Sequence, residues 1–329
     1  MSTHRVNIIR AFREAFAEEM ARDASVILVG EDVWVGGVFG TSRGLYEKFG
    51  STRVRNTPIS EGAVVGMAVG AAMTGMRPIV DLMYMTFGYM AMDSIVNQAA
   101  KFRYMTGGQV KVPLVLVGVS GGGHAGAAQH SENPYHMFMG VPGLKVVVPS
   151  DPYTGKGLLK SAVRDDNPVL VFHEANLNRV RQDIPDDEYV YPIGKARTVL
   201  PGADVTVATV GHVLQHGLEA AHRAKETHGI SVEVVDVLSL NPLDVDTLAA
   251  SVRKTGRLLV ADDTPELGGA AGQIVAAVTP RVWGDLKASP VSIGRRFAPI
   301  AFNRTLESLS VVNSQRLYDS IVRIVLEDE

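Results

Sequence analysis

The chain has 329 residues, of which 46% are hydrophobic and 20% charged, with a formal net charge of −3. This composition indicates a globular protein with a sizeable core and excludes a disordered chain, and the length indicates two domains. The mild acidity argues against nucleic-acid binding. The absence of cysteine excludes disulfides, thiolate nucleophiles and cysteine-ligated metal sites.

Apolar residues recur at helical spacing from Ile9 to Met20, so we expect an amphipathic helix at residues 5–22 rather than a signal peptide. The most apolar stretch, between residues 61 and 77, falls short of the ~20 residues that a membrane span needs. We therefore expect a cytoplasmic protein without a membrane segment.

Short apolar runs alternate with helical patterns along the rest of the chain. In the first half we expect strands at 26–29, 78–82, 113–119, 145–148 and 168–172, and helices at 61–75, 90–104 and 152–164. In the second half we expect strands at 205–210, 232–237, 258–261 and 291–293, and helices at 213–226, 244–252, 270–278 and 314–326. This alternation is typical of α/β folds with a parallel sheet covered on both faces.

A polar segment with prolines and acids interrupts the pattern at residues 176–201. We interpret it as a linker between two doubly wound domains, one at residues 1–175 and one at residues 202–329.

The glycine-rich segment at 121–126 has GxGxxG spacing after an expected strand, and Asp151 follows the next strand. This arrangement predicts, as one alternative, a nicotinamide or flavin oxidoreductase. Such a fold needs a long helix directly after the glycines, whereas Pro134 and Pro142 leave room only for a short one. The other interpretation is a loop whose backbone closely approaches another group.

Two side chains are candidates for proton chemistry. His130 follows the glycine-rich segment, in a loop after a strand end, where open parallel sheets bind ligands; the alternative is a structural histidine. Glu61 begins the helix of small residues at 61–75. One interpretation is that this acid has no catalytic role and only interacts favourably with the positive end of the helix dipole. Beside an apolar helix its carboxyl is expected to lose hydration, and such a carboxyl can share a proton with a ring nitrogen.

Many motifs match one known family in order and at family spacing, from about residue 5 to about residue 280. They include GEDV, GGVFG, TPISE, AVGAAMTGMRPIV, NQAAKFRYMTGG, AAQHSE, PGLKVVVPSDP, VDVLSLNPLDVDT and TGRLLV. The chain resembles the beta subunits of thiamine-diphosphate-dependent 2-oxoacid dehydrogenases, a group with pyruvate, branched-chain and acetoin dehydrogenase components. The resemblance implies a transketolase-like fold: a pyrimidine-binding domain with a mainly parallel sheet, then a transketolase C-terminal domain.

The resemblance also implies roles for individual residues. Glu61 would hydrogen-bond the pyrimidine nitrogen of the cofactor, Phe87 would stack on the pyrimidine with Met83 beside it, and His130 would face the substrate or the lipoyl group. A potassium ion would be bound, largely through backbone carbonyls, by Leu114, Ala162, Val163, Asp165 and Asn167.

A GDG motif followed by a distant asparagine, which would bind the magnesium of the cofactor's diphosphate, is missing from this chain. The resemblance assigns that motif and its Mg²⁺ to an alpha subunit. It therefore implies a shared thiamine diphosphate site, an alpha2beta2 assembly and a lipoyl acyltransferase core as a further partner.

The predicted activity is decarboxylation of a 2-oxo acid, or cleavage of acetoin, with transfer of the acyl group to lipoamide. Phe297 and Ala301 stand where the family usually has the Asp and second Pro of an Asp-x-Pro-x-Pro segment. This departure leaves open an alternative, a split carboligase or transketolase-like pair that transfers an acyl or ketol unit. A non-catalytic scaffold would have no need for Glu61, Phe87 and His130 together.

Overall fold

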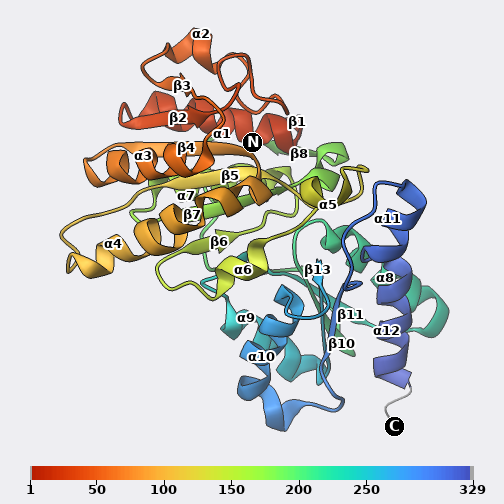
Figure 1. Ribbon diagram of the computed structural model, residues 1–329. Helices are drawn as coiled ribbons and strands as arrows, with labels where there is room; N and C mark the ends of the chain where they lie inside the picture. The colour runs from red at the N-terminus through yellow and green to blue at the C-terminus, as the bar shows by residue number, and fades with distance from the viewer. Residues whose placement is uncertain (1, 327–329) are drawn as a thin grey trace. The chain divides into compact units, whose positions relative to one another are not determined.

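The computed structural model describes residues 2–326, and the chain divides into two compact units, each built around its own sheet (Figure 1). The first unit comprises the residues up to Ser120 and Met137–Ile193; the second comprises Gly121–His136 and the residues from Gly194 onward. The glycine-rich segment therefore groups with the second half of the chain. The exact ends of the domains and linker stay a prediction.

The sheet of the first unit contains parallel strands in the order β6-β7-β5-β4-β2-β3. Their bounds are β2 (Val26–Gly30), β3 (Val54–Asn56), β4 (Arg77–Tyr84), β5 (Val115–Ser120), β6 (Lys145–Val147) and β7 (Val169–Glu174). Every residue of β2, β5 and β7 is buried. Continuous apolar strands of this kind occur where helices cover both faces of a parallel sheet, which confirms the predicted α/β class.

The order of these strands reverses at β2. After β2 the chain adds β3 on one side, and after β3 it returns to add β4 on the other side of β2. In open α/β sheets the crevice outside the carboxyl ends of the strands at such a switch point is where ligands bind. The fold thus places the expected ligand-binding site at the carboxyl ends of β2 and β4.

The helices of the first unit are α1 (Ile8–Arg22), α2 (Leu45–Phe49), α3 (Glu61–Met73), α4 (Ala100–Met105) and α7 (Pro152–Arg164), with α6 (Tyr135–Met139) at its boundary. The prediction that the first helix begins at residue 5 is wrong. Residues 5–7 belong to β1 (Thr3–Asn7), which pairs antiparallel with β8 (Arg181–Pro185). Asn7 caps α1 by accepting a hydrogen bond from the backbone of Arg10.

The helix predicted at 90–104 is also corrected. The structure has a 3₁₀ segment at Met85–Ala91, a π segment at Asp93–Ala99 and only then α4. Such departures from α-helical winding are often found at functional positions, and this one follows directly after the carboxyl end of β4.

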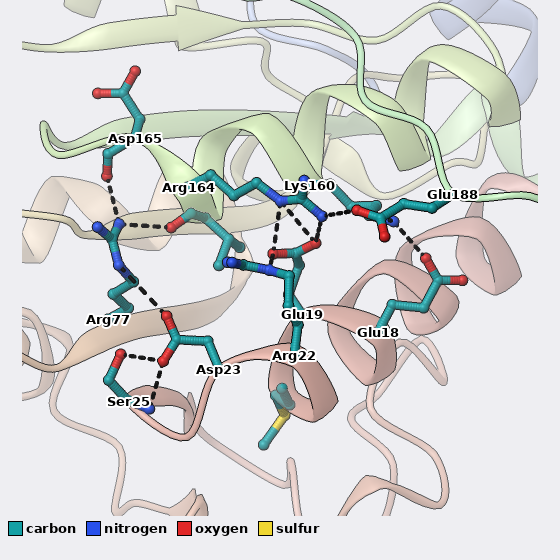
Figure 2. Close-up of polar contacts among 12 residues, drawn as sticks. Glu18, Glu19, Arg22, Asp23, Ser25, Arg77, Lys160, Arg164, Asp165 and Glu188 are labelled. Atoms are coloured by element: carbon teal, nitrogen blue, oxygen red, sulfur yellow. Dashed lines mark hydrogen bonds and ion pairs between the residues drawn. The ribbon is translucent and has the colours of Figure 1, made fainter.

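Charged side chains join α1 to α7, and Figure 2 shows how they lie. Glu19 is fully buried and accepts hydrogen bonds from Arg164, at 2.6 Å from Nη2, and from Arg22, at 2.8 Å from Nε. Lys160 is 1% exposed and contacts Glu18 at 2.7 Å. Glu19 holds the pKa of Arg164 well above its usual value, because the charged guanidinium donates hydrogen bonds to this buried carboxylate.

The sheet of the second unit has the order β14-β13-β10-β11-β9, in which only β9 runs antiparallel. Its strands are β9 (Arg197–Leu200), β10 (Val205–Thr209), β11 (Val232–Asp236), β13 (Leu258–Pro265) and β14 (Val291–Arg295). Its helices are α5 (Ala127–His130), α8 (Val213–His228), α9 (Val245–Thr255), α10 (Ala270–Val282), α11 (Arg304–Ser310) and α12 (Ser314–Leu326). In Figure 1, α8 and α12 lie on one side of this sheet and α9 and α10 on the other.

Apolar side chains of α8 and α12 pack on β10, β11 and β13 to form one core of this unit. Among residues 2–326 no helix is both long and apolar enough to cross a membrane.

Candidate functional site

The crevice between the ends of β2 and β4 contains a small cavity. It is lined by Gly30, Glu31, Thr57, Glu61, Val64, Asp81 and Leu82. Gly30 pairs with Asp81 in the sheet, and a Cβ on Gly30 would lie only 2.5 Å from the Asp81 carbonyl oxygen. The close approach of the two strands therefore requires glycine at this position.

Three acidic side chains face this cavity from different elements. Burial, and secondarily the charges of Glu61 and Asp32, raises the pKa of Glu31. Burial also raises the pKa of Asp81, although hydrogen bonds from the Met83 amide and the Thr41 hydroxyl partly offset that effect. The sequence pointed to Glu61 alone. Glu31 was not predicted, although one feature of the sequence indicates it: it is the glutamate of GEDV, close after the strand expected at 26–29.

The hydroxyl of Thr57 is buried at the same cavity. Its Oγ1 has no hydrogen-bond partner within residues 2–326. Buried polar atoms in proteins are nearly always hydrogen-bonded, so an unpartnered hydroxyl beside carboxyl groups suits a polar ligand that the chain does not itself supply.

Met83 follows Asp81 in a left-handed backbone conformation with φ of 63°. This conformation costs a residue with a side chain about 1–2 kcal/mol. The carboxylate of Asp81 offsets part of the cost by accepting a hydrogen bond from the Met83 amide at 2.9 Å. Strain of this kind clusters at functional sites.

Phe87 lies four residues further, in the 3₁₀ segment. Its ring packs edge-on against Tyr84, with ring centroids 5.5 Å apart, and Tyr84 packs in the same way against Phe39. Glu61, Met83 and Phe87 are all only partly buried. Of these three residues Glu61 lines the cavity, whereas Met83 and Phe87 follow its lining residue Leu82 in the chain. Each of the three has surface left to contact a ligand.

His130 is the last residue of α5 and is partly buried. It belongs to the second unit, whereas Glu61, Met83 and Phe87 belong to the first. The helix after the glycine-rich segment has only four residues. A dinucleotide fold needs a long helix there, so the structure does not support the nicotinamide alternative.

The five residues that the resemblance assigns to potassium lie before β5 and around the end of α7: Leu114, Ala162, Val163, Asp165 and Asn167. The carbonyl oxygens of Val163 and Asp165 converge on Nη1 of Arg77, at 3.0 Å each; Figure 2 shows the bond to Asp165. The carbonyl oxygen of Leu114 accepts the amide of Val169. A cationic guanidinium therefore already takes two of these carbonyl oxygens, and the potassium site stays a prediction.

Comparison with known proteins identifies the family. A model described as the transketolase pyrimidine-binding domain matches residues 4–180, and one described as the transketolase C-terminal domain matches residues 194–317. The chain is 43% identical to the acetoin:2,6-dichlorophenolindophenol oxidoreductase subunit beta of Cupriavidus necator, over 95% of each chain. It is 38% identical to the pyruvate dehydrogenase E1 component subunit beta of Porphyra purpurea, over 98% of this chain and 97% of that one. The chain belongs to the dehydrogenase E1 beta-subunit family.

A further member of that family, the 2-oxoisovalerate dehydrogenase subunit beta of Bacillus subtilis, is 41% identical over 95% of this chain and 96% of its own. The fold is also that of a solved split-gene transketolase, described as an inactive beta4 tetramer, with a TM-score of 0.79 and 22% identity over 98% of this chain and 99% of that one. The predicted transketolase-like fold and E1 beta-subunit family are therefore confirmed. The chain is the beta subunit of a thiamine-diphosphate-dependent 2-oxoacid or acetoin dehydrogenase E1 component.

Proposed function

We propose that the crevice at β2 and β4 binds the aminopyrimidine ring of thiamine diphosphate. The observation that carries this proposal is the placement of Glu61 at the switch point of the sheet, beside two further acids and the unpartnered Thr57 hydroxyl. When bound, the cofactor supplies a thiazolium carbon that becomes a nucleophile on losing its proton. Glu61 holds a proton at the pyrimidine nitrogen, and Phe87 and Met83 provide the surface on which the ring lies.

His130 serves the substrate side of the reaction in this proposal. A histidine can donate a hydrogen bond to a carboxylate or carbonyl and can move a proton near neutral pH. The substrate is a 2-oxo acid or acetoin, and the acyl group passes to lipoamide on an acyltransferase core. The names of the relatives, which include acetoin, pyruvate and 2-oxoisovalerate enzymes, support this substrate class.

A specific observation favours a second candidate acceptor. Phe297, which replaces the usual Asp, is 66% exposed, so the C-terminal segment has a different surface from that expected for an acyltransferase contact. An aldehyde or ketone acceptor would make the protein half of a carboligase. Turnover of the assembled enzyme with lipoamide, and none with aldehydes, would exclude this candidate; the reverse result would establish it.

We infer an alpha subunit as partner, in an alpha2beta2 assembly, and Mg²⁺ bound to that subunit. The relatives are named as beta subunits. One face of α3 supports the inference, because Ala63, Gly66, Met67 and Gly70 are apolar and exposed. Contiguous exposed apolar surface commonly marks an interface, and the small residues let another backbone come close.

The chain alone should bind thiamine diphosphate weakly, because it lacks the GDG motif for the diphosphate. Binding should appear when the alpha subunit and magnesium are added. Calorimetric titration of the cofactor into the chain, with and without its partner, measures this difference. Tight binding by the isolated chain would contradict the shared site.

A pair of matched variants tests the interface in the same experiment. Among residues 2–326, and leaving aside chain neighbours and the backbone of the same helix, no atom lies within 4 Å of a Cβ built on Gly70 or on Gly272, an exposed glycine of α10. A larger side chain at either position therefore begins in open space. Gly70→Leu should abolish capture of the alpha subunit and the cofactor binding that depends on it, whereas Gly272→Leu should leave both intact. Normal assembly of Gly70→Leu would exclude this face of α3 from the interface.

Potassium at the carbonyls around Val163 and Asp165 should stabilise the chain. A ligand present at 100 times its Kd stabilises by about 2.7 kcal/mol, so potassium with a Kd of about 1 mM should raise Tm measurably at about 100 mM KCl. Thermal unfolding in KCl and NaCl at equal ionic strength compares the two ions. Identical Tm values would exclude a selective potassium site.

We also propose that the protein acts in the cytoplasm. Some relatives are chloroplastic forms, such as a beta subunit of Oryza sativa. Cell fractionation followed by detection of the chain would test the proposal, and recovery in an organelle or membrane fraction would contradict it.

A further inference from the structure

The glycine-rich loop of the second unit surrounds one buried carboxylate. Oε1 of Glu307, in α11, accepts a hydrogen bond from the amide of Gly123 at 2.7 Å, and Oε2 accepts one from the amide of Ala125 at 3.1 Å. Glu307 is only 3% exposed. The loop backbone has positive φ at every second residue, namely Gly121, Gly123, Ala125 and Ala127. Successive amides in such a conformation form an anion-binding concavity.

The geometry of the loop is matched to this carboxylate. A Cβ on Gly122 would lie 3.2 Å from Oε1 of Glu307, so the lack of a side chain there makes room for the acid. Ala125 and Ala127 hold left-handed conformations that residues with a side chain rarely adopt. Contacts outside the loop must maintain them, and the bond from Ala125 to Glu307 is one such contact.

Other contacts fix the far end of the loop to the same unit. The side-chain amide of Asn133 donates to the carbonyl of Asp263 at 3.4 Å, and that of Gln273 donates to the carbonyl of His136 at 3.1 Å. In the sequence, His130 lies between the residues that bond to Glu307 and the residues that make these contacts. Its position therefore depends on how both ends of the loop are held.

We propose that Glu307 is a positioning residue, whose carboxylate fills the anion site of the loop and thereby places His130 for catalysis. The charge-assisted hydrogen bonds from two amides fix the left-handed turns. The reaction rate falls steeply when a catalytic group is displaced even slightly. The part of the inference that concerns His130 rests on the proposed function. The part that concerns the conformation of the loop does not.

The experiment removes the carboxylate and supplies another from solution. In the complex with the alpha subunit, Glu307→Ala should lower kcat about 10- to 100-fold while the Kd for thiamine diphosphate changes less than about threefold. Amide hydrogen exchange at residues 121–127 should become at least about tenfold faster. Formate can occupy the emptied site, so it should raise the turnover of Glu307→Ala at least about threefold and slow the amide exchange. Chloride at equal ionic strength should do neither.

Three variants serve as controls. Glu266→Ala removes an exposed glutamate of the same unit and should change nothing. Glu307→Gln fills the space without the charge and should gain nothing from formate. His130→Ala should lose turnover with no rescue and with normal exchange of the loop.

Each result bears on the inference. Unchanged exchange and turnover in Glu307→Ala would overturn it, and so would a loss of turnover that formate does not relieve, because that result indicates general misfolding. If the wild-type complex has no 2-oxo acid or acetoin turnover, the proposed function fails by itself. The exchange measurement, with and without formate, then still decides whether Glu307 sets the loop.

Discussion

Replacing Glu61 by glutamine will lower turnover of the assembled enzyme by about 100- to 10,000-fold, the range typical of a lost general acid–base group. Glutamine keeps the shape of the side chain at the start of α3 but cannot exchange a proton with the pyrimidine nitrogen. Assembly and overall structure should stay intact, because Glu61 forms part of a cavity wall and is only partly buried. Steady-state kinetics of the purified complex, with size-exclusion chromatography to verify assembly, measure the effect.

Glu47→Gln, an exposed position on α2, provides the matched control and should keep wild-type turnover. Glu31→Gln distinguishes the acids of the cavity. It removes a neighbouring charge but not the proposed proton carrier, so its effect should be smaller than that of Glu61→Gln. If Glu61→Gln turned over at nearly the normal rate, the role assigned to this carboxyl would be wrong.

Replacing Glu19 by alanine will lower the free energy of unfolding by about 3 kcal/mol, because the change leaves Arg164 without the buried partner that it contacts through two nitrogens. For a domain in the size range of the first unit, roughly 150–250 residues, such a loss lowers Tm by roughly 6–12 °C. Thermal unfolding followed by circular dichroism measures it. The packing of α1 on α7 is the structure that weakens.

The control uses the same guanidinium. Arg164 also contacts Glu188 at 2.5 Å, but that carboxylate is 61% exposed. Water replaces an exposed partner at little cost, so Glu188→Gln should change the free energy of unfolding by less than about 1 kcal/mol. Equal effects of the two substitutions would show that burial of Glu19 is not what makes this ion pair important.

The strands and long helices followed from local patterns because each depends mainly on its own residues. The spacing of apolar residues from Ile9 to Met20 defines the buried face of α1 wherever that helix packs. Residues 5–7 could not be assigned in this way, since their strand exists only by pairing with β8, about 175 residues later in the chain. The 3₁₀ and π segments between 85 and 99 likewise have no distinct pattern of their own.

The candidate site shows the same division. Glu61 and His130 were indicated by their positions in the sequence pattern, and Met83 and Phe87 by a family resemblance; the roles of all four stay predictions. Asp81 and Thr57 were missed because they meet Glu61 only after the order of strands reverses at β2. The spacing of residues along the sequence does not reveal this reversal of strand order. The contact between Glu307 and the loop at 121–127 joins residues about 180 positions apart, and it too required coordinates.

That last contact has a consequence for protein engineering. Residue 194 is the obvious junction for exchanging the C-terminal half between two relatives, because the match to the C-terminal domain begins there. Such a chimera would take its glycine-rich loop from one parent and the acid that fills it from the other. We expect chimeras to work best when residues 121–136 are transplanted together with the C-terminal half, even though this requires two additional junctions in the chain.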